Sequence, residues 1–235
     1  MNQENLEKLV QRFQNLFAKD KNYYAMDYGD RFNPKRNKET NKIEYSADEN
    51  GKRPFWYVDH DLRSRTYWQH LECLNTEEDA REREVVYMDW AIIIPPITEN
   101  NECKFGAIDV DIYNKPEELK RIVSEIYKEE LPIVPCYSKS GGLHLYVFLK
   151  EFTKCSAVIK YLKSINKKLN IKAKEIFPKQ EKLKWNEKKK SFSVGNGILI
   201  PYKSCLWTDD GRYTKSSNEW IMNDRMETGT IHEFL

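Results

Sequence analysis

Two aspartates and a glycine turn carry the residue types that could do chemistry in this chain. Asp109 and Asp111 alternate with the apolar residues Ile108, Val110 and Ile112, which is the period of a β-strand. Side chains at i and i+2 of a strand share one face, so both carboxylates project together from a buried sheet. Two anions held that close repel each other unless a cation lies between them. The pair therefore predicts a site for a hard divalent ion, Mg2+ or Mn2+, which prefers carboxylate oxygens and also binds phosphates.

A second segment, residues 138–146, reads Ser-Lys-Ser-Gly-Gly-Leu-His-Leu-Tyr and supplies groups that could meet a nucleotide. Its adjacent glycines can adopt positive φ and bring backbone N–H groups close to an anion. A lysine and two hydroxyls lie in the turn, and a histidine follows on the next strand. The residues expected to meet a triphosphate are Lys139, Ser140, Gly141, Gly142 and His144. Together with the aspartates they suggest a nucleotide–metal site.

These groups need a sheet to position them, and the periodicity around them predicts its elements. Strands are expected over 85–94, 105–112, 133–137 and 143–148. Helices are expected where apolar residues recur at helical spacing, over 6–17, 116–127 and 158–169. From the acidic strand onward the order is strand-helix-strand-strand-helix-strand, a split βαβ arrangement. The expected fold class is therefore α+β.

Composition narrows the classes of protein. The 235 residues are 40% apolar without a run of eighteen, which argues against a transmembrane helix, and residues 1–10 are not a signal peptide. Five cysteines without a Cys-x-x-Cys pair favour a reduced, cytoplasmic protein. The net charge of +2 makes no global case for nucleic acid, so any such case depends on local patches.

Polar and basic stretches are candidates for such patches. Residues 30–53 are expected to form a loop or loose hairpin, 181–193 a lysine-rich insertion, and 208–217 another polar loop. A lysine run is most often simply solvated, and contact with nucleic acid is the alternative. Trp56 and Trp185 neighbour basic residues and could stack on bases, although most tryptophans serve packing.

Several motifs in order resemble the archaeo-eukaryotic primase superfamily, especially the primase-polymerases of phages, plasmids and bacterial defence systems. They are Asp109/Asp111, the Ser-Gly-Gly-x-His-x-Tyr segment, the Glu-Ile-Phe-Pro-Lys-Gln segment 175–180, and the Gly-Asn-Gly-Ile-Leu-Ile-Pro-Tyr segment 195–202. Residues 66–71 and the strand before the acidic pair are similar as well, so the likeness spans roughly 66 to 220. Each motif alone is weak, and their order is what makes the resemblance specific.

The resemblance implies a fold and a set of subregions. The fold would be the primase catalytic core, a ferredoxin-like (RRM-like), mixed or antiparallel sheet packed by helices, with an N-terminal α/β lobe. Residues 1–235 would form one catalytic domain. Within it, residues 1–84 would be a helical and basic subregion, and residues 85–235 would hold the catalytic sheet with the metal and nucleotide motifs.

It also implies an activity, template-directed nucleotidyl transfer by a DNA primase or polymerase with two Mg2+ or Mn2+ ions. The substrates would be NTP or dNTP and a single-stranded or primed DNA template, with a helicase or other replication protein as a possible partner and no membrane. The setting would be the cytoplasm of a bacterial, archaeal or phage-infected cell. In the family a third carboxylate completes the metal site. Glu175 is the best match, and Asp209 or Asp210 is the alternative.

Two further residues receive roles from the same resemblance. Lys179, in the Pro-Lys-Gln turn, would be a second phosphate contact, and Asn196, between two glycines, would face the sugar or cap a turn. Other readings remain open. The chain could be a nucleic-acid-binding module without turnover, or a glycosyltransferase that holds metal through Asp-x-Asp. His70 and Cys73 with Cys103 could also form part of a zinc site.

Overall fold

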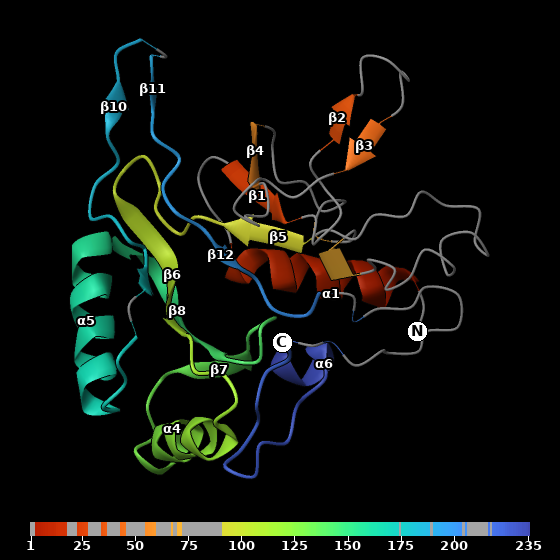
Figure 1. Cartoon of the computed structure of the whole chain (residues 1–235), viewed down its shortest axis with the longest axis vertical. Coiled ribbons are helices and arrows are strands. Elements are labelled where there is room, and N and C mark those ends of the chain that lie inside the picture. Colours follow the sequence, from red (N-terminus) through yellow and green to blue (C-terminus); the bar gives the residue numbers. More distant parts are fainter. Residues whose placement is uncertain are drawn as a thin grey trace.

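The computed structural model describes residues 3–17, 23–27, 34–36, 43–45, 55–59, 67, 70–71, 91–173, 175–188, 190–203, 205, 216 and 218–235. Its helices are α1 (Gln3–Leu16), α4 (Pro116–Lys128), α5 (Cys155–Lys168) and α6 (Ile231–Phe234) (Figure 1). Its first strands are β1 (Tyr23–Asp27), β2 (Pro34–Arg36), β3 (Ile43–Tyr45), β4 (Phe55–Asp59), β5 (Ala91–Ile94) and β6 (Glu102–Val110). The later strands are β7 (Val134–Tyr137), β8 (Leu143–Lys154), β9 (Glu175–Phe177), β10 (Trp185–Asn186), β11 (Ser191–Phe192) and β12 (Ile198–Leu199).

The sheet that carries both motifs has the order β7-β8-β6-β9, and every neighbouring pair in it is antiparallel. Along the chain its elements run β6-α4-β7-β8-α5-β9. This is the split βαβ arrangement expected from the periodicity. The predicted α+β class with a ferredoxin-like sheet is therefore confirmed, and the sheet is antiparallel throughout.

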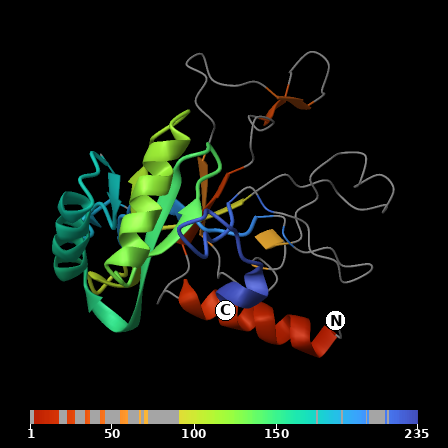
Figure 2. The ribbon, with the colours of Figure 1, turned by 90° about the horizontal axis from the view of Figure 1, so that it is seen from below.

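The two faces of this sheet pack against different layers. Alternate residues such as Ile108 and Val110 face α4 and α5 and form one apolar cluster with them. The opposite face, with Ala107 and Tyr146, packs on α1 and the second sheet in another cluster. Figure 2 shows α4 and α5 on one side of the strands and α1 with α6 on the other. Asp109 belongs to the second face, so it points into the space between the two sheets.

The helices form where the apolar spacing predicts them. Helix α4 begins at Pro116 and buries the predicted stripe Leu119, Ile122, Val123 and Ile126. Helix α1 buries Leu9, Val10, Phe13, and Phe17 just beyond its end. None of the described helices combines the length and apolarity that a membrane crossing requires.

The second sheet has the order β12-β5-β1-β4, again with antiparallel neighbours. Strand β5 is the end of the strand expected over 85–94, and its four residues are buried. It pairs with β12, which lies about a hundred residues later in the chain. The sheet therefore holds the Gly-Asn-Gly-Ile-Leu motif over the face of the first sheet that carries Tyr146 and Asp109.

His70 ties this second sheet together and is fully buried. Its Nδ1 accepts a hydrogen bond from the Ile92 N–H at 3.2 Å, and its Nε2 donates to the Pro201 carbonyl oxygen at 2.8 Å. Both ring nitrogens are thus engaged with backbone groups, and a zinc ion on this histidine would have to replace one of these hydrogen bonds. Cys73, Asp209 and Asp210 lie outside the described residues, as does most of the basic stretch 30–53.

Candidate active site

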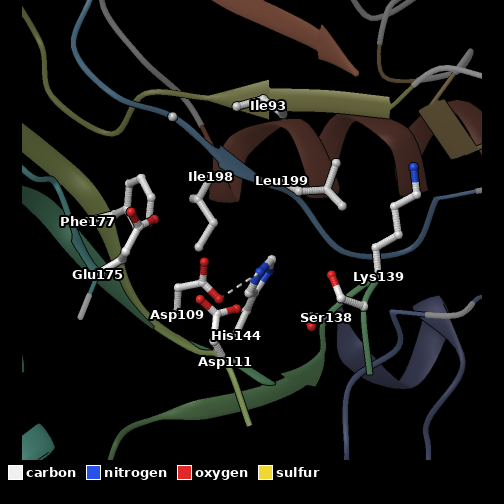
Figure 3. A pocket seen from close by; sticks show the side chains of 12 residues that line it. Ile93, Asp109, Asp111, Ser138, Lys139, His144, Glu175, Phe177, Ile198 and Leu199 are labelled. Carbon is white, nitrogen blue, oxygen red and sulfur yellow. Dashed lines mark ion pairs between the residues drawn. The ribbon is translucent and has the colours of Figure 1, made fainter. Parts of the chain in front are cut away.

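Three strands bring three polar side chains into one row. Asp109 on β6 lies directly opposite His144 on β8 and directly opposite Glu175 on β9. Opposite residues of antiparallel strands project from the same face with Cβ atoms about 4.5–5.5 Å apart. The histidine and the candidate third carboxylate therefore flank the first aspartate on either side (Figure 3).

Asp111 lies just beyond the end of β6, two residues after Asp109, and lines the same cavity. Its Oδ1 accepts a hydrogen bond from the hydroxyl of Tyr113, a side chain that is 45% exposed at the rim. This hydrogen bond is the largest cause of the raised pKa of the Tyr113 hydroxyl. Sequence reasoning did not identify it, although its position two residues after an Asp-x-Asp pair was visible.

Burial and like charge shape the titration of Asp109. Its pKa is raised to about 7, first by burial and then by the nearby Asp111 and Glu175 carboxylates, while Lys179 acts in the opposite direction. Burial lowers the pKa of His144 to about 4, so this ring is neutral near pH 7. The contact of 3.5 Å between His144 Nε2 and Asp109 Oδ1 therefore joins a carboxyl group to a neutral imidazole.

The opposite side of the His144 ring is held by a hydrogen-bond chain. His144 Nδ1 lies 3.2 Å from the Tyr146 hydroxyl, which in turn donates to the Leu199 carbonyl oxygen at 2.5 Å. Because the tyrosine's single proton goes to that carbonyl, Nδ1–H is the donor to the tyrosine oxygen. This assignment leaves Nε2 facing Asp109. Leu199 belongs to β12, so the contact also connects the two sheets.

Glu175 has a cationic partner close by. Its Oε1 lies 2.5 Å from the ammonium of Lys179, and that ammonium lies 4.9 Å from the centroid of the Phe177 ring. The lysine is therefore held beside the carboxylate row. It does not line the cavity itself, so its expected phosphate contact remains a prediction.

The glycine turn is closed by its own hydrogen bonds. Gly142 N–H donates to Ser138 Oγ at 2.9 Å, and Gly141 N–H donates to the Ser138 carbonyl at 3.1 Å. Gly141 has φ +87°, as the sequence predicted, and a Cβ on Gly142 would lie 2.3 Å from the Val110 carbonyl oxygen. The glycines thus let the turn approach the end of β6. Their N–H groups are used inside the turn here, and their expected contact with an anion remains a prediction.

These residues line a cavity of about 310 Å³ between the two sheets. The sequence-predicted residues that line it are Asp109, Asp111, Lys139, Ser140, His144 and Glu175. Lys139 rises on the other side of the cavity from the carboxylates (Figure 3). The lining residues not predicted are Ser138 and the apolar Ile93, Phe177, Ile198 and Leu199, together with Gly197. Most of these apolar residues belong to the second sheet. No local sequence pattern predicts that this sheet packs over the first one.

Asn196 lies apart from this cavity. Its backbone N–H donates to Gln180 Oε1 at 3.3 Å, and its side-chain oxygen accepts from Gln180 Nε2. It lines a neighbouring cavity at the base of the β10–β11 hairpin. In this structure it therefore supports a turn, and contact with a sugar remains a prediction.

The donor set suits a hard divalent ion in type, because the carboxylates share one cavity and raise the pKa of the buried member. As they stand, however, no three His, Cys, Asp or Glu side chains in the described part of the chain are grouped closely enough to hold a metal. The carboxylates have protein partners instead, namely His144, Tyr113 and Lys179. Metal binding would therefore require these contacts to be exchanged for metal contacts.

Comparison with known families agrees with the geometry. Residues 8–209 match the family described as "TOTE conflict system, Archaeo-Eukaryotic Primase domain". No curated protein matches the chain. The family match spans the sheet, the aspartate pair, the glycine turn and the Glu175 segment, and thus most of the chain.

Proposed function

We propose that this chain, which belongs to the archaeo-eukaryotic primase domain family of TOTE conflict systems, is a template-directed nucleotidyltransferase that adds NTP or dNTP to a 3′-hydroxyl. The observation that carries the proposal is the row formed by Asp109, His144 and Glu175, with Asp111 beside it, at one cavity between two sheets. The row places carboxylate oxygens, which could bind metal ions, next to a buried histidine at one cavity, where a polyphosphate would bind. The template would be single-stranded or primed DNA.

The carboxylates would hold the divalent ions. Asp109, Asp111 and Glu175 supply the oxygen ligands that Mg2+ and Mn2+ prefer. When bound, two such ions would lower the pKa of the primer 3′-hydroxyl and stabilise charge on the transferring phosphate. The raised pKa of Asp109 supports this assignment, since a nearby cation would offset both the burial and the repulsion that raise it.

The groups on the other side of the cavity would receive the triphosphate. Lys139 and Ser140 line it from the turn, and His144 lines it from β8. A polyanion beside His144 would raise the ring's pKa from about 4, and a protonated Nε2 could then donate to a phosphate oxygen. The Tyr146–Leu199 chain fixes the ring's orientation for that contact. Lys179 would move from Glu175 to a phosphate when metal occupies the carboxylates.

A primer-extension assay tests the proposal. The protein is incubated with a primed and an unprimed DNA template, with labelled NTPs and dNTPs supplied separately, and with Mg2+ or Mn2+. We expect incorporation that the variant Asp109→Ala/Asp111→Ala lowers by about a thousandfold, since metal ligation supplies several kcal/mol to the transition state. The control Glu151→Ala/Asp224→Ala removes the same charge from exposed positions and should remain active.

Two outcomes would contradict the proposal. If the unaltered protein bound DNA but incorporated nothing with either ion, the chain would be a nucleic-acid-binding module of the same fold. If the aspartate variant kept its activity, these carboxylates would not hold the catalytic ions. Donor specificity for a nucleotide sugar in place of a nucleoside triphosphate would instead identify a glycosyltransferase.

A further inference from the structure

The hairpin β10–β11 projects from the rest of the molecule (Figure 1). Trp185 pairs with Phe192 and Asn186 with Ser191 in this two-stranded ribbon. The segment 179–196 that contains it holds six lysines and two glutamates, a net charge of +4. The whole chain carries only +2, so the positive charge of this protein is concentrated here. Such a local excess favours a polyanionic partner.

Trp185 presents a large aromatic surface on this basic hairpin. It is 47% exposed, and its ring packs edge-on against Phe192 with centroids 5.0 Å apart. The packing holds the indole in place and leaves part of it in water. A single exposed aromatic is common on protein surfaces, so exposure alone would mean little. An exposed aromatic ring among lysines is the arrangement that binds single-stranded nucleic acid, because a base stacks on the ring and the phosphates contact the lysines.

A cavity of about 460 Å³ lies at the base of the hairpin. It is lined by Gln180, Lys182, Lys184, Ser193, Val194, Gly195 and Asn196. Asn196 lines this cavity and the next residue, Gly197, lines the candidate active-site cavity. Two lysines that shortly precede Trp185 in the chain thus line a cavity at the foot of the hairpin.

The hairpin lysines differ in their partners. Lys190 forms an ion pair with Glu187 at 3.0 Å, and both side chains are about three-quarters exposed. No ion pair joins Lys182 or Lys184 to a carboxylate in the part of the chain that the structure describes. The positive charges of these two lysines are therefore not neutralised by an ion pair among the described residues. They also line the cavity at the base of the hairpin.

We propose that the β10–β11 hairpin binds single-stranded nucleic acid, with Trp185 stacked on a base and Lys182 and Lys184 on the phosphates. The identity of that strand as the template rests on the proposed function. A duplex would offer the phosphates but no unstacked base to Trp185, so the hairpin selects single strands. An acidic polypeptide would offer only charge, and its binding would not depend on the indole.

The test measures binding to the full chain without nucleotide and in the presence of EDTA, so catalysis plays no part. Fluorescence anisotropy reports the Kd for labelled single strands of about 16 nucleotides, as DNA and as RNA, and for the matching duplexes. The variants are Trp185→Ala, Trp185→Phe and Lys182→Ala/Lys184→Ala. Matched controls are Phe152→Ala, another exposed aromatic, and Lys160→Ala/Lys163→Ala on the exposed face of α5.

We expect Trp185→Ala to weaken single-strand binding about tenfold and Trp185→Phe to weaken it less. The double lysine variant should reduce the slope of log K against log salt by about 1.4, the value for two lost phosphate contacts on a single strand. Binding should also quench part of the intrinsic fluorescence, and this part should be absent in Trp185→Phe. Tighter binding of DNA or of RNA by the unaltered protein identifies the kind of strand.

Several results would overturn the inference. The inference fails if Trp185→Ala binds single strands as tightly as wild type, or if the α5 control variant loses as much affinity as the hairpin variants. It also fails if the unaltered protein binds no single strand, or if polyglutamate displaces the strand equally well from wild type and from Trp185→Ala. The proposed function fails separately. If the protein binds single strands through the hairpin but incorporates no nucleotide, this inference holds and the proposed function is wrong. If the protein incorporates nucleotides but the hairpin variants bind as wild type does, the proposed function holds and this inference is wrong.

Discussion

Glu175 faces Asp109 across the antiparallel strands β9 and β6, at the same register as His144 on the far side of Asp109. The two carboxylates are 66 residues apart in the chain, by way of a helix, a hairpin and a second helix, yet the sheet makes them neighbours. Burial raises the pKa of Asp109, and Asp111 and Glu175 raise it further. The relationship makes Glu175 the best-placed third carboxylate among the described residues.

Replacing Glu175 with Gln tests this assignment. We expect nucleotide incorporation to fall about a hundredfold or more and the divalent-ion requirement to rise, because a neutral amide is a weaker ligand for a hard ion. Initial rates across a Mg2+ titration provide the measurement. Glu181→Gln makes the same chemical change at an exposed position and should leave both values unchanged. Activity within threefold of wild type in Glu175→Gln would transfer the role to another carboxylate.

The Tyr113 hydroxyl donates a hydrogen bond to Asp111 and would compete with a metal ion for that carboxylate. Tyr113→Phe should therefore lower the divalent-ion concentration for half-maximal activity by about fivefold, as expected for loss of one exposed hydrogen bond of about 1 kcal/mol. The same titration measures the shift. Tyr161→Phe on α5 serves as the control. A higher requirement in Tyr113→Phe would instead mean that the tyrosine positions Asp111 for the ion.

The two glycines of the turn should respond differently to alanine. At Gly142 a Cβ would collide with the Val110 carbonyl at 2.3 Å, so Gly142→Ala should cost about 2 kcal/mol or more of unfolding free energy and displace Ser140 from the cavity. At Gly141 nothing lies within 4 Å, and only the φ of +87° opposes a side chain, at about 1 kcal/mol. Denaturant unfolding and incorporation rates compare the pair. Equal losses would mean that the turn does not pack on β6 as the structure shows.

His70 should make the fold sensitive to acid. Burial lowers its pKa from 6.5 in the unfolded chain to about 4, so below pH 6.5 the unfolded state binds a proton that the folded state excludes. The stability due to neutral His70 is full above pH 6.5 and is lost as pH falls toward 4. His70→Gln keeps one donor and one acceptor without titrating. The difference in unfolding free energy between wild type and this variant should therefore shrink by about 1.4 kcal/mol per pH unit across that range.

Urea unfolding at several pH values between 4 and 7 measures this change. His232→Gln, on the exposed side of α6, is the comparison variant. Burial also lowers the pKa of His232, but less than that of His70, so this variant should change the pH slope less than His70→Gln does. Parallel loss of stability in wild type and His70→Gln would show that other groups cause the acid sensitivity.

Local sequence signals predicted the strands and helices of the first sheet and helix α1, because periodicity records which face of each element is buried. They did not predict β1 and β4 of the second sheet. The stripe from Leu119 to Ile126 predicted α4, and Pro116 marked its start. The alternation around Asp109 placed it and Asp111 on one side of a strand. Helix and strand order then limited the sheet to a split βαβ topology, and the motif order pointed to the primase family that the comparison bears out.

What the sequence by itself determined was therefore the elements of the first sheet and helix α1, their buried faces, the α+β class and the family. The tertiary structure alone decided which residues meet: Glu175 opposite Asp109, Leu199 above Tyr146, and β12 against β5. It also showed that the glycine N–H groups close their own turn. The physical reason is that strand register and the approach of a second sheet result from long-range packing and hydrogen bonding, which leave no local periodicity in the chain.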